Sequence, residues 1–316
     1  MKKLKKLVLL DFGPKDLPEE YQKKLSRLAE KIEIVSKDDP KRLDIAKDTD
    51  GLVVKISTKV DKDFIDSCNN LKYISVYSTA FNEIDAQYAA KKRIAVTNIA
   101  NYCTEAVAEF LFAALLSNVR ELERARDQAR AKDYSFNKFM NWELKGKTFG
   151  VIGLGNIGQR AAELAQGLGL NVIYWSRTRK KDYEKKGIKF VELPELLEKS
   201  DIIAPFLAMN SETKGFLNRE RLAKIKKDAV IVCLTLVQLV EFDALMECLQ
   251  KDQFTFITDH ADLVEPEKID LLAENKNFVV YPPVAFRTRE ADKTKNEILI
   301  ENLTKFLEGK PQNKVN

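Results

Sequence analysis

Short apolar segments alternate with amphipathic segments along most of this chain. In the first hundred residues, KLVLLDF, GLVVKI, LKYISVYS and RIAVTNI have the length and composition of buried strands. Between them, LPEEYQKKLSRLAE and DKDFIDSCNN carry apolar residues at helical spacing. Alternating strand and helix patterns predict an α/β fold, with a parallel sheet and helices on its faces.

The second half of the chain repeats this alternation after a long helical segment. TEAVAEFLFAALLSNVRELERARDQ predicts one continuous helix that connects a first domain to a second. Strand patterns then follow in NVIYW, KFVEL, DIIAPFLAM, AVIVCLTL, FTFITD and FVVYPPV. The last segment, READKTKNEILIENLTKFLEGK, predicts a helix that returns to the first domain. We therefore expect a discontinuous domain of residues 1–100 and 287–316, and an inserted domain of residues 101–286.

A glycine motif stands at the start of the second series, in TFGVIGLGNIGQR. Gly153 permits a tight turn, Gly155 lets the backbone approach a pyrophosphate, and Gly158 lets the following helix pack close to the strand. Asn156 and Ile157 open that helix, whose free N–H groups favour phosphate. The motif follows a strand pattern and precedes a helix pattern, which favours a Rossmann dinucleotide site over a purely structural turn.

The next strand pattern ends in NVIYWSRTRKK, without the acidic residue that usually binds the ribose of NAD. Ser176 stands at that position, and Arg177, Thr178 and Arg179 follow it. Hydroxyl groups and guanidinium groups suit phosphate oxygens, so the segment favours NADP over NAD. The alternative is that Arg177 and the adjoining lysines are solvated charges of a loop.

Composition excludes several other classes of protein. A length of 316 residues suits two domains, and the net charge of +5 comes from basic residues interleaved with acids, which argues against a nucleic-acid partner. The apolar run in MKKLKKLVLLDFGP is too short for a signal peptide, and no apolar stretch reaches the roughly 20 residues of a membrane span. Four scattered cysteines and one histidine exclude a zinc site built from such residues. We expect a soluble, cytoplasmic protein without a metal.

Nearly the whole chain resembles the D-isomer-specific 2-hydroxyacid dehydrogenases, especially the glyoxylate and hydroxypyruvate reductase branch. The resemblance depends on STAFNEIDAQYAAKKRIAVTNIANYCTEAVAEF, LKGKTFGVIGLGNIGQRAAELAQGLGLNVIYWSRTRK, SDIIAPFLAMNSETKGFLNRERLAKIKKDAVIV and the terminal helix. It implies a doubly wound Rossmann domain inserted into a smaller, flavodoxin-like substrate domain, and a homodimer. It also implies hydride transfer between a nicotinamide, NAD or NADP, and a small 2-keto or 2-hydroxy acid.

The chain departs from this family where catalytic residues are expected. The substrate-binding arginine belongs in VIVCLTLVQLVEFDAL, where Leu236 takes its place, and the catalytic histidine belongs in YPPVAF, where Pro283 does. Glu265 matches the glutamate that partners this histidine, although its spacing from Asp259 is one residue longer than usual. Asp259 itself matches the residue that faces the nicotinamide carboxamide.

Other departures make the expected cleft more apolar. Phe206 and Ala208 replace a histidine and a proline, and Ser78 and Ala80 replace glycines. The only histidine, His260, adjoins Asp259 near a strand end, so strand alternation predicts that it faces away from the cofactor. The remaining polar candidates near the cleft mouth, to which no motif assigns a role, are Tyr281, Tyr102, Lys55, Arg287 and Arg289.

Two classes of function follow from these residues. The first is an NAD(P)-dependent oxidoreductase that acts on a small 2-keto or 2-hydroxy acid, or on a related carbonyl compound, with altered catalytic groups. The second is a non-catalytic protein that binds a dinucleotide in a regulatory role. The family resemblance favours the first class, whereas Leu236 and Pro283 favour the second.

Overall fold

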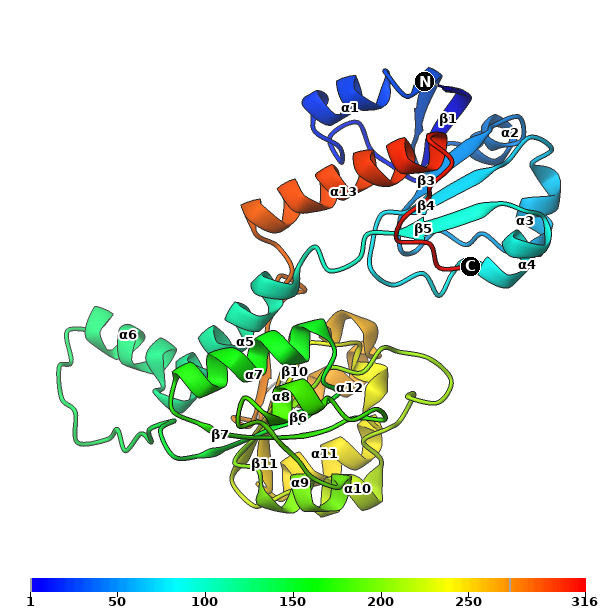
Figure 1. Ribbon diagram of the computed structural model, residues 1–316. Coiled ribbons are helices and arrows are strands. Elements are labelled where there is room, and N and C mark those ends of the chain that lie inside the picture. Colours follow the sequence, from blue (N-terminus) through cyan, green and yellow to red (C-terminus); the bar gives the residue numbers. More distant parts are fainter. Residues whose placement is uncertain (1, 273) are drawn as a thin grey trace. The chain divides into compact units, whose positions relative to one another are not determined.

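The computed structural model describes residues 2–272 and 274–316 of the chain. It divides into two compact units (Figure 1). Unit 1 comprises Met1–Tyr102 and Thr288–Asn316, and unit 2 comprises Cys103–Arg287. The chain therefore leaves unit 1, completes unit 2, and returns.

Unit 1 is a five-stranded parallel sheet with helices on both faces. Its strand order is β2-β1-β3-β4-β5, which is the flavodoxin-like order and confirms the predicted architecture. The elements are β1 (Leu4–Leu10), α1 (Glu19–Leu25), β2 (Ala29–Val35), α2 (Arg42–Ala46), β3 (Gly51–Val54), α3 (Lys62–Ser67), β4 (Tyr73–Val76), α4 (Ala86–Lys91), β5 (Ala95–Asn98) and α13 (Arg289–Leu307).

Both faces of this sheet are buried, because apolar side chains run continuously along β1. Leu7 and Leu9 enter one core, to which α13 contributes Leu299 and Leu303. Alternate residues of the same strand point into a second core on the opposite face, with side chains of α2, α3 and α4. The returning helix α13 therefore completes one of the two cores of unit 1.

One prediction in unit 1 is wrong. The segment LPEEYQKKLSRLAE was expected to be helical throughout, but α1 ends at Leu25 and strand β2 begins at Ala29. The following KIEIV has the alternating, β-branched pattern of a strand, and it pairs in parallel with β1 along the edge of the sheet. Pairing with β1 therefore outweighs the helical spacing of the last residues of the segment.

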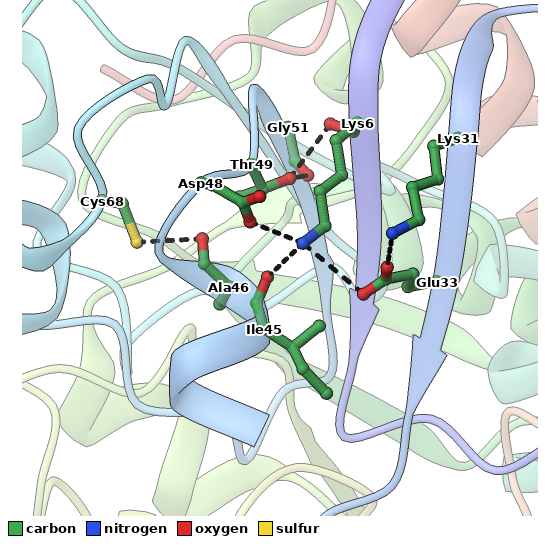
Figure 2. A network of polar contacts seen from close by, with 9 residues as sticks. All are labelled: Lys6, Lys31, Glu33, Ile45, Ala46, Asp48, Thr49, Gly51 and Cys68. Carbon is green, nitrogen blue, oxygen red and sulfur yellow. Dashed lines mark hydrogen bonds and ion pairs between the residues drawn. The ribbon is translucent and has the colours of Figure 1, made fainter. Parts of the chain in front are cut away.

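A network of polar contacts lies at the C-terminal end of α2 (Figure 2). The Lys6 ammonium group, which extends from β1, donates to the Ile45 carbonyl at 2.6 Å and to Asp48 Oδ1 at 2.5 Å. Glu33 Oε2 lies 3.5 Å from the same nitrogen. Lys6 thus satisfies a carbonyl group at a helix end, where a positive charge is favourable. These contacts lie at the amino end of the sheet and are structural.

Unit 2 is a seven-stranded parallel sheet in the order β12-β11-β10-β9-β6-β7-β8, as in a doubly wound Rossmann fold. Its elements are α5 (Thr104–Val119), α6 (Leu122–Arg130), β6 (Thr148–Ile152), α7 (Asn156–Gly167), β7 (Asn171–Trp175), α8 (Lys181–Glu184), β8 (Lys189–Phe190), α9 (Leu193–Lys199), β9 (Ile202–Pro205), α10 (Arg219–Ala223), β10 (Ala229–Cys233), η1 (Val237–Leu239), α11 (Phe242–Gln250), β11 (Phe254–Thr258), η2 (Ala261–Leu263), α12 (Pro266–Asp270) and β12 (Phe278–Val280).

Helices cover both faces of this sheet. Val230 and Val232 of β10 point into a core shared with α5 and α7, whereas Ile231 points into a core shared with α9, α10 and α11. The predicted connector helix is wrong in one respect, because it is two helices. Glu121 has a left-handed backbone (φ 46°), which ends α5 and starts α6 in a new direction.

No helix among the described residues is long and apolar enough to cross a membrane. Within the same residues, no three or more His, Cys, Asp or Glu side chains converge as a metal site would require. The four cysteines are free thiols.

Candidate functional site

The carboxyl ends of the unit 2 strands meet at one edge of the sheet, where strand order reverses on the two sides of β6. Open α/β sheets bind ligands at such a switch point. The turn after β6 is fixed by both neighbouring strands, since Gly153 N donates to the Trp175 carbonyl at 2.8 Å. On the other side, Phe206 N donates to the Ile152 carbonyl at 2.7 Å. The glycine motif therefore lies at the switch point.

The fold requires two of the three motif glycines. Gly153 has φ +95°, and a side chain there would meet the Phe206 carbonyl oxygen at 3.0 Å. A Cβ at Gly158 would lie 2.3 Å from the Gly153 carbonyl oxygen, within the contact between α7 and its strand. Gly155 is different, because its φ is −79° and a Cβ would meet nothing within 4 Å. The space at Gly155 is open at the N-terminus of α7, where backbone N–H groups favour an anion.

The loop after β7 gives its arginines different surroundings. Ser176 Oγ donates to the Thr178 carbonyl at 2.6 Å, which closes the loop on itself. The Arg177 side chain is 88% exposed and has one long contact, 3.3 Å to Glu212. Arg179 instead makes two bonds to Glu184, at 3.0 and 2.5 Å, and stacks on the ring of Phe190. Arg177 is thus available to a ligand, whereas Arg179 is engaged in a structural cluster.

Asp259 lies directly after β11 and is buried, with 1% of its side chain exposed. Its Oδ2 accepts a bond from Ala285 N at 3.2 Å, but Oδ1 has no hydrogen-bond partner. Burial raises the pKa of the Asp259 carboxyl, and the nearby His260 opposes part of this rise. Asp259 Oδ1 is therefore a buried acceptor that can take a hydrogen bond from a bound molecule.

The strand alternation used to place His260 does not extend to this residue. His260 Nε2 lies 3.8 Å from Asp259 Oδ1, and Nδ1 lies 3.9 Å from Asp262 Oδ1. The strand ends at Thr258, and His260 (φ −125°, ψ 35°) already starts the short helix η2. Strand alternation therefore no longer applies at this residue, and the imidazole turns alongside the carboxylate.

The positions expected to hold catalytic groups carry none. Leu236 follows β10 and precedes η1, and Pro283 follows β12. Both are partly buried at the carboxyl edge of the sheet. Glu265 starts α12 on the surface, with 69% of its side chain exposed and its Oε2 3.8 Å from Lys268. Phe206 and Ala208 follow β9 at the same edge.

The other polar candidates have local partners within their own units. In unit 1, Lys55 pairs with Asp16 at 2.6 Å, and Lys295 lies 5.4 Å from the centre of the Tyr102 ring. In unit 2, Tyr281 packs edge-on against Phe110. The Arg287 backbone N–H donates to the Val284 carbonyl, which closes a turn. Arg289 is the first residue of α13, and Ser78 and Ala80 follow β4.

Sequence reasoning missed three features of this edge. Gln238 in η1 has a buried side-chain oxygen without a partner, and Cys233 at the end of β10 is fully buried. Burial raises the pKa of the Cys233 thiol to about 11, so it is neutral at physiological pH. The third missed feature is Glu184, which accepts two hydrogen bonds from Arg179. The signal for Gln238 was its position as a polar residue within the mostly apolar segment LTLVQLV.

Comparison with known proteins gives consistent results. Residues 112–285 match the family described as D-isomer specific 2-hydroxyacid dehydrogenase, NAD binding domain. The chain is 31% identical over 283 residues to a glyoxylate reductase of Thermococcus litoralis, which covers 87% of this chain and 86% of that protein. An acyclic imino acid reductase, solved in complex with NADPH and D-Arg, is 28% identical with a TM-score of 0.89 and covers 98% of this chain and 100% of that one. A D-lactate dehydrogenase of Aquifex aeolicus, solved with NAD and lactic acid, is 26% identical with a TM-score of 0.86 and covers 96% of each chain.

Proposed function

Because the chain belongs to the D-isomer specific 2-hydroxyacid dehydrogenase family, we propose that it is an NAD(P)-dependent reductase of a small 2-oxo acid or a related carbonyl compound. The observation that carries this proposal is the open space at Gly155. The fold itself requires Gly153 and Gly158, whereas at position 155 it leaves room for a side chain, and in this proposal the glycine there lets the backbone approach the pyrophosphate. In this proposal unit 2 binds the dinucleotide and unit 1 is the substrate domain.

The chain offers suitable groups for each part of the dinucleotide. The turn from Gly153 to Gly158, with Asn156 and Ile157 at the start of α7, would hold the pyrophosphate. Ser176, Arg177 and Thr178 would meet the adenosine ribose, and Asp259 would accept a bond from the carboxamide. When bound, the reduced nicotinamide supplies the hydride.

We propose a preference for NADP(H) over NAD(H). Ser176 stands directly after β7, where an acidic residue would repel a 2′-phosphate, and Arg177 is exposed with one contact, 3.3 Å to Glu212. A guanidinium group can bind a phosphate group through two parallel hydrogen bonds. Arg179 is excluded from this role by its pairing with Glu184.

The substrate differs from that of a typical family member. Leu236 cannot pair with a carboxylate, and Pro283 cannot transfer a proton. Glu265 is exposed on the surface and pairs with Lys268, so it does not compensate. We therefore expect this protein to turn over glyoxylate and hydroxypyruvate at least about 10²-fold more slowly than an enzyme with a positioned catalytic acid does.

A second candidate is reduction of an imine formed from a 2-oxo acid and an amine. An imine protonates more readily than a ketone, so it needs less from a catalytic acid. Asp259 and Gln238 both present buried acceptor oxygens without partners at this edge, and an N–H group would satisfy either. The similarity to the acyclic imino acid reductase supports this candidate.

Oxidation of NADPH and NADH at 340 nm tests both candidates. Glyoxylate, hydroxypyruvate and pyruvate are each supplied alone and with methylamine, and the products are identified by mass spectrometry. Turnover stimulated by methylamine supports imine reduction, and turnover without amine supports carbonyl reduction. Binding of NADPH without turnover under any condition would instead support the non-catalytic alternative.

We also propose that two copies of the chain associate through unit 2. Among the residues whose burial the structure describes, five of the ten exposed large apolar side chains fall between residues 122 and 168, namely Leu122, Tyr134, Phe136, Met140 and Leu168. An open groove between α5 and α7 is lined by Glu109, Phe112, Glu163, Leu164, Gly167 and Leu168. Exposed apolar surface of this kind is typical of an interface. Free thiols favour a reducing compartment, the cytoplasm, for the assembled protein.

A further inference from the structure

Unit 1 has a switch point of its own, between strands β1 and β3. These strands are neighbours in the sheet, but the chain leaves them toward opposite faces. After β1 it continues into α1, which packs in the same core as α13, whereas after β3 it continues into α3, which packs in the core of the other face. The loops 11–18 and 55–61 therefore separate at the carboxyl edge of the sheet. Sheets with this strand order bind ligands at such a point.

One ion pair joins the two loops. Lys55, which directly follows β3, donates from Nζ to Asp16 Oδ2 at 2.6 Å. The same oxygen accepts a hydrogen bond from Gly13 N at 2.5 Å. The side chains of Lys55 and Asp16 are 37% and 38% exposed, so small solutes can reach the pair.

Two positive charges act on Asp16. Burial acts to raise the pKa of this carboxyl, but the hydrogen bonds that it accepts and the charges of Lys55 and Lys295 outweigh burial and hold the pKa below its usual range. Asp16 is therefore an anion at neutral pH. The ammonium group of Lys55 lies 5.4 Å from the centre of the Phe12 ring. That of Lys295 lies 3.9 Å from the centre of the Tyr77 ring, and such cation–π contacts stabilise both ammonium groups at this edge.

We propose that this ion pair marks a carboxylate-binding site, in which Asp16 occupies the place of the substrate carboxylate and Lys55 supplies the positive charge that the chain lacks at Leu236. This inference rests on the proposed reductase function, and it assigns the carboxylate of the 2-oxo acid to unit 1. Lys55 is then the residue that selects substrates with a carboxylate over neutral carbonyl compounds.

The chemistry of the pair allows this exchange. Asp16 Oδ2 accepts one hydrogen bond from an ammonium group and one from a backbone N–H, and the oxygen of a bound carboxylate can accept the same two bonds. An exposed ion pair is weak, so little free energy is lost when Asp16 turns to solvent. Lys55 Nζ and Gly13 N then both donate to the ligand.

The first experiment measures binding without turnover. Calorimetry gives the Kd of oxamate, an unreactive analogue of pyruvate, for the full-length protein saturated with NADPH. Lys55→Met should raise this Kd by about tenfold or more through loss of a charge-assisted hydrogen bond, while the Kd for NADPH stays within about twofold. Lys59→Met is the matched control, because this lysine lies in the same loop and pairs with Asp61 at 3.0 Å. An oxamate Kd that is the same in Lys55→Met as in the wild type would overturn the site.

The second experiment distinguishes a competing carboxylate from a structural one. Asp16→Asn keeps an oxygen for Gly13 N but removes the charge that competes for Lys55. It should therefore lower the Kd of oxamate by about two- to fivefold, and most of this gain should disappear when Lys55→Met is combined with it. A Kd that is unchanged or higher in Asp16→Asn would show that the ion pair is only structural.

The wild type separates failure of the site from failure of the proposed function. A protein that binds NADPH but not oxamate would overturn the carboxylate site alone. A protein that binds neither NADPH nor NADH would overturn the proposed function, and the carboxylate site with it.

Discussion

Arg177 and Arg179 are two residues apart, and their surroundings predict different effects of mutation. We expect the wild type to bind NADPH more tightly than NADH, and Arg177→Ala to narrow this difference by about 1–3 kcal/mol through loss of a charge-assisted hydrogen bond. Arg179→Ala is the matched control and should leave the difference intact, because that side chain is held by Glu184. Nicotinamide fluorescence titrations measure both affinities. Equal binding of the two dinucleotides by the wild type would contradict the phosphate site.

Asp259 links the site to the stability of the fold. Burial raises the pKa of the Asp259 carboxyl in the folded state. The carboxyl group therefore makes its full contribution to the free energy of unfolding below its unfolded pKa of about 3.9, and this contribution is lost as the pH rises through the folded pKa. Asp259→Asn removes the ionisation and should raise the free energy of unfolding by about 1–3 kcal/mol at pH 7, with no gain near pH 3.5.

Urea denaturation at the two pH values measures this prediction for Asp259→Asn. Asp262→Asn is the comparison, because half of that side chain is exposed and the same change should alter stability little. A variant less stable than the wild type at pH 7 would show that the carboxylate supports the fold.

At the scale of elements, glycine has two different roles in the turn between β6 and α7. Gly155→Val should abolish measurable dinucleotide binding and cost the fold about 1 kcal/mol at the helix N-terminus, since a Cβ there meets only open space. Gly158→Val should instead destabilise the fold by more than about 3 kcal/mol, because its Cβ would overlap the Gly153 carbonyl oxygen. Calorimetry and circular dichroism separate the two effects. Retained affinity in Gly155→Val would mean that the turn is only structural.

The elements also show which features a sequence can predict. The glycine turn was predictable because its requirements lie within eleven residues of local chain. The break at Glu121 was not, because a left-handed residue there leaves no mark in the spacing of apolar positions. Strand β2 was obscured because KIEIV follows a helical pattern directly, and its state depends on pairing with β1. The approach of His260 to Asp259 depends on where a strand stops, which periodicity does not fix.

At the scale of the whole molecule, the exposed apolar residues of unit 2 predict a dimer. Phe136→Glu combined with Met140→Glu should shift the protein toward monomer, because each charge would have to be buried in the interface. Leu271→Glu, at an exposed apolar position outside that segment, is the control. Sedimentation velocity over a range of concentrations gives the distribution of species. A wild type that is monomeric at every concentration would remove the basis for this interface.

The return of α13 to unit 1 also determines when unit 1 can be completed during synthesis of the chain. The last strand of unit 1 is finished by residue 98, yet Leu299 and Leu303 are needed to close one of its cores. At about 5–20 residues per second, a ribosome needs on the order of 10–40 s to make the intervening stretch. Unit 2 is complete earlier, at residue 287. The nascent N-terminal sheet therefore waits with one apolar face uncovered, which makes it a natural substrate for chaperones during translation.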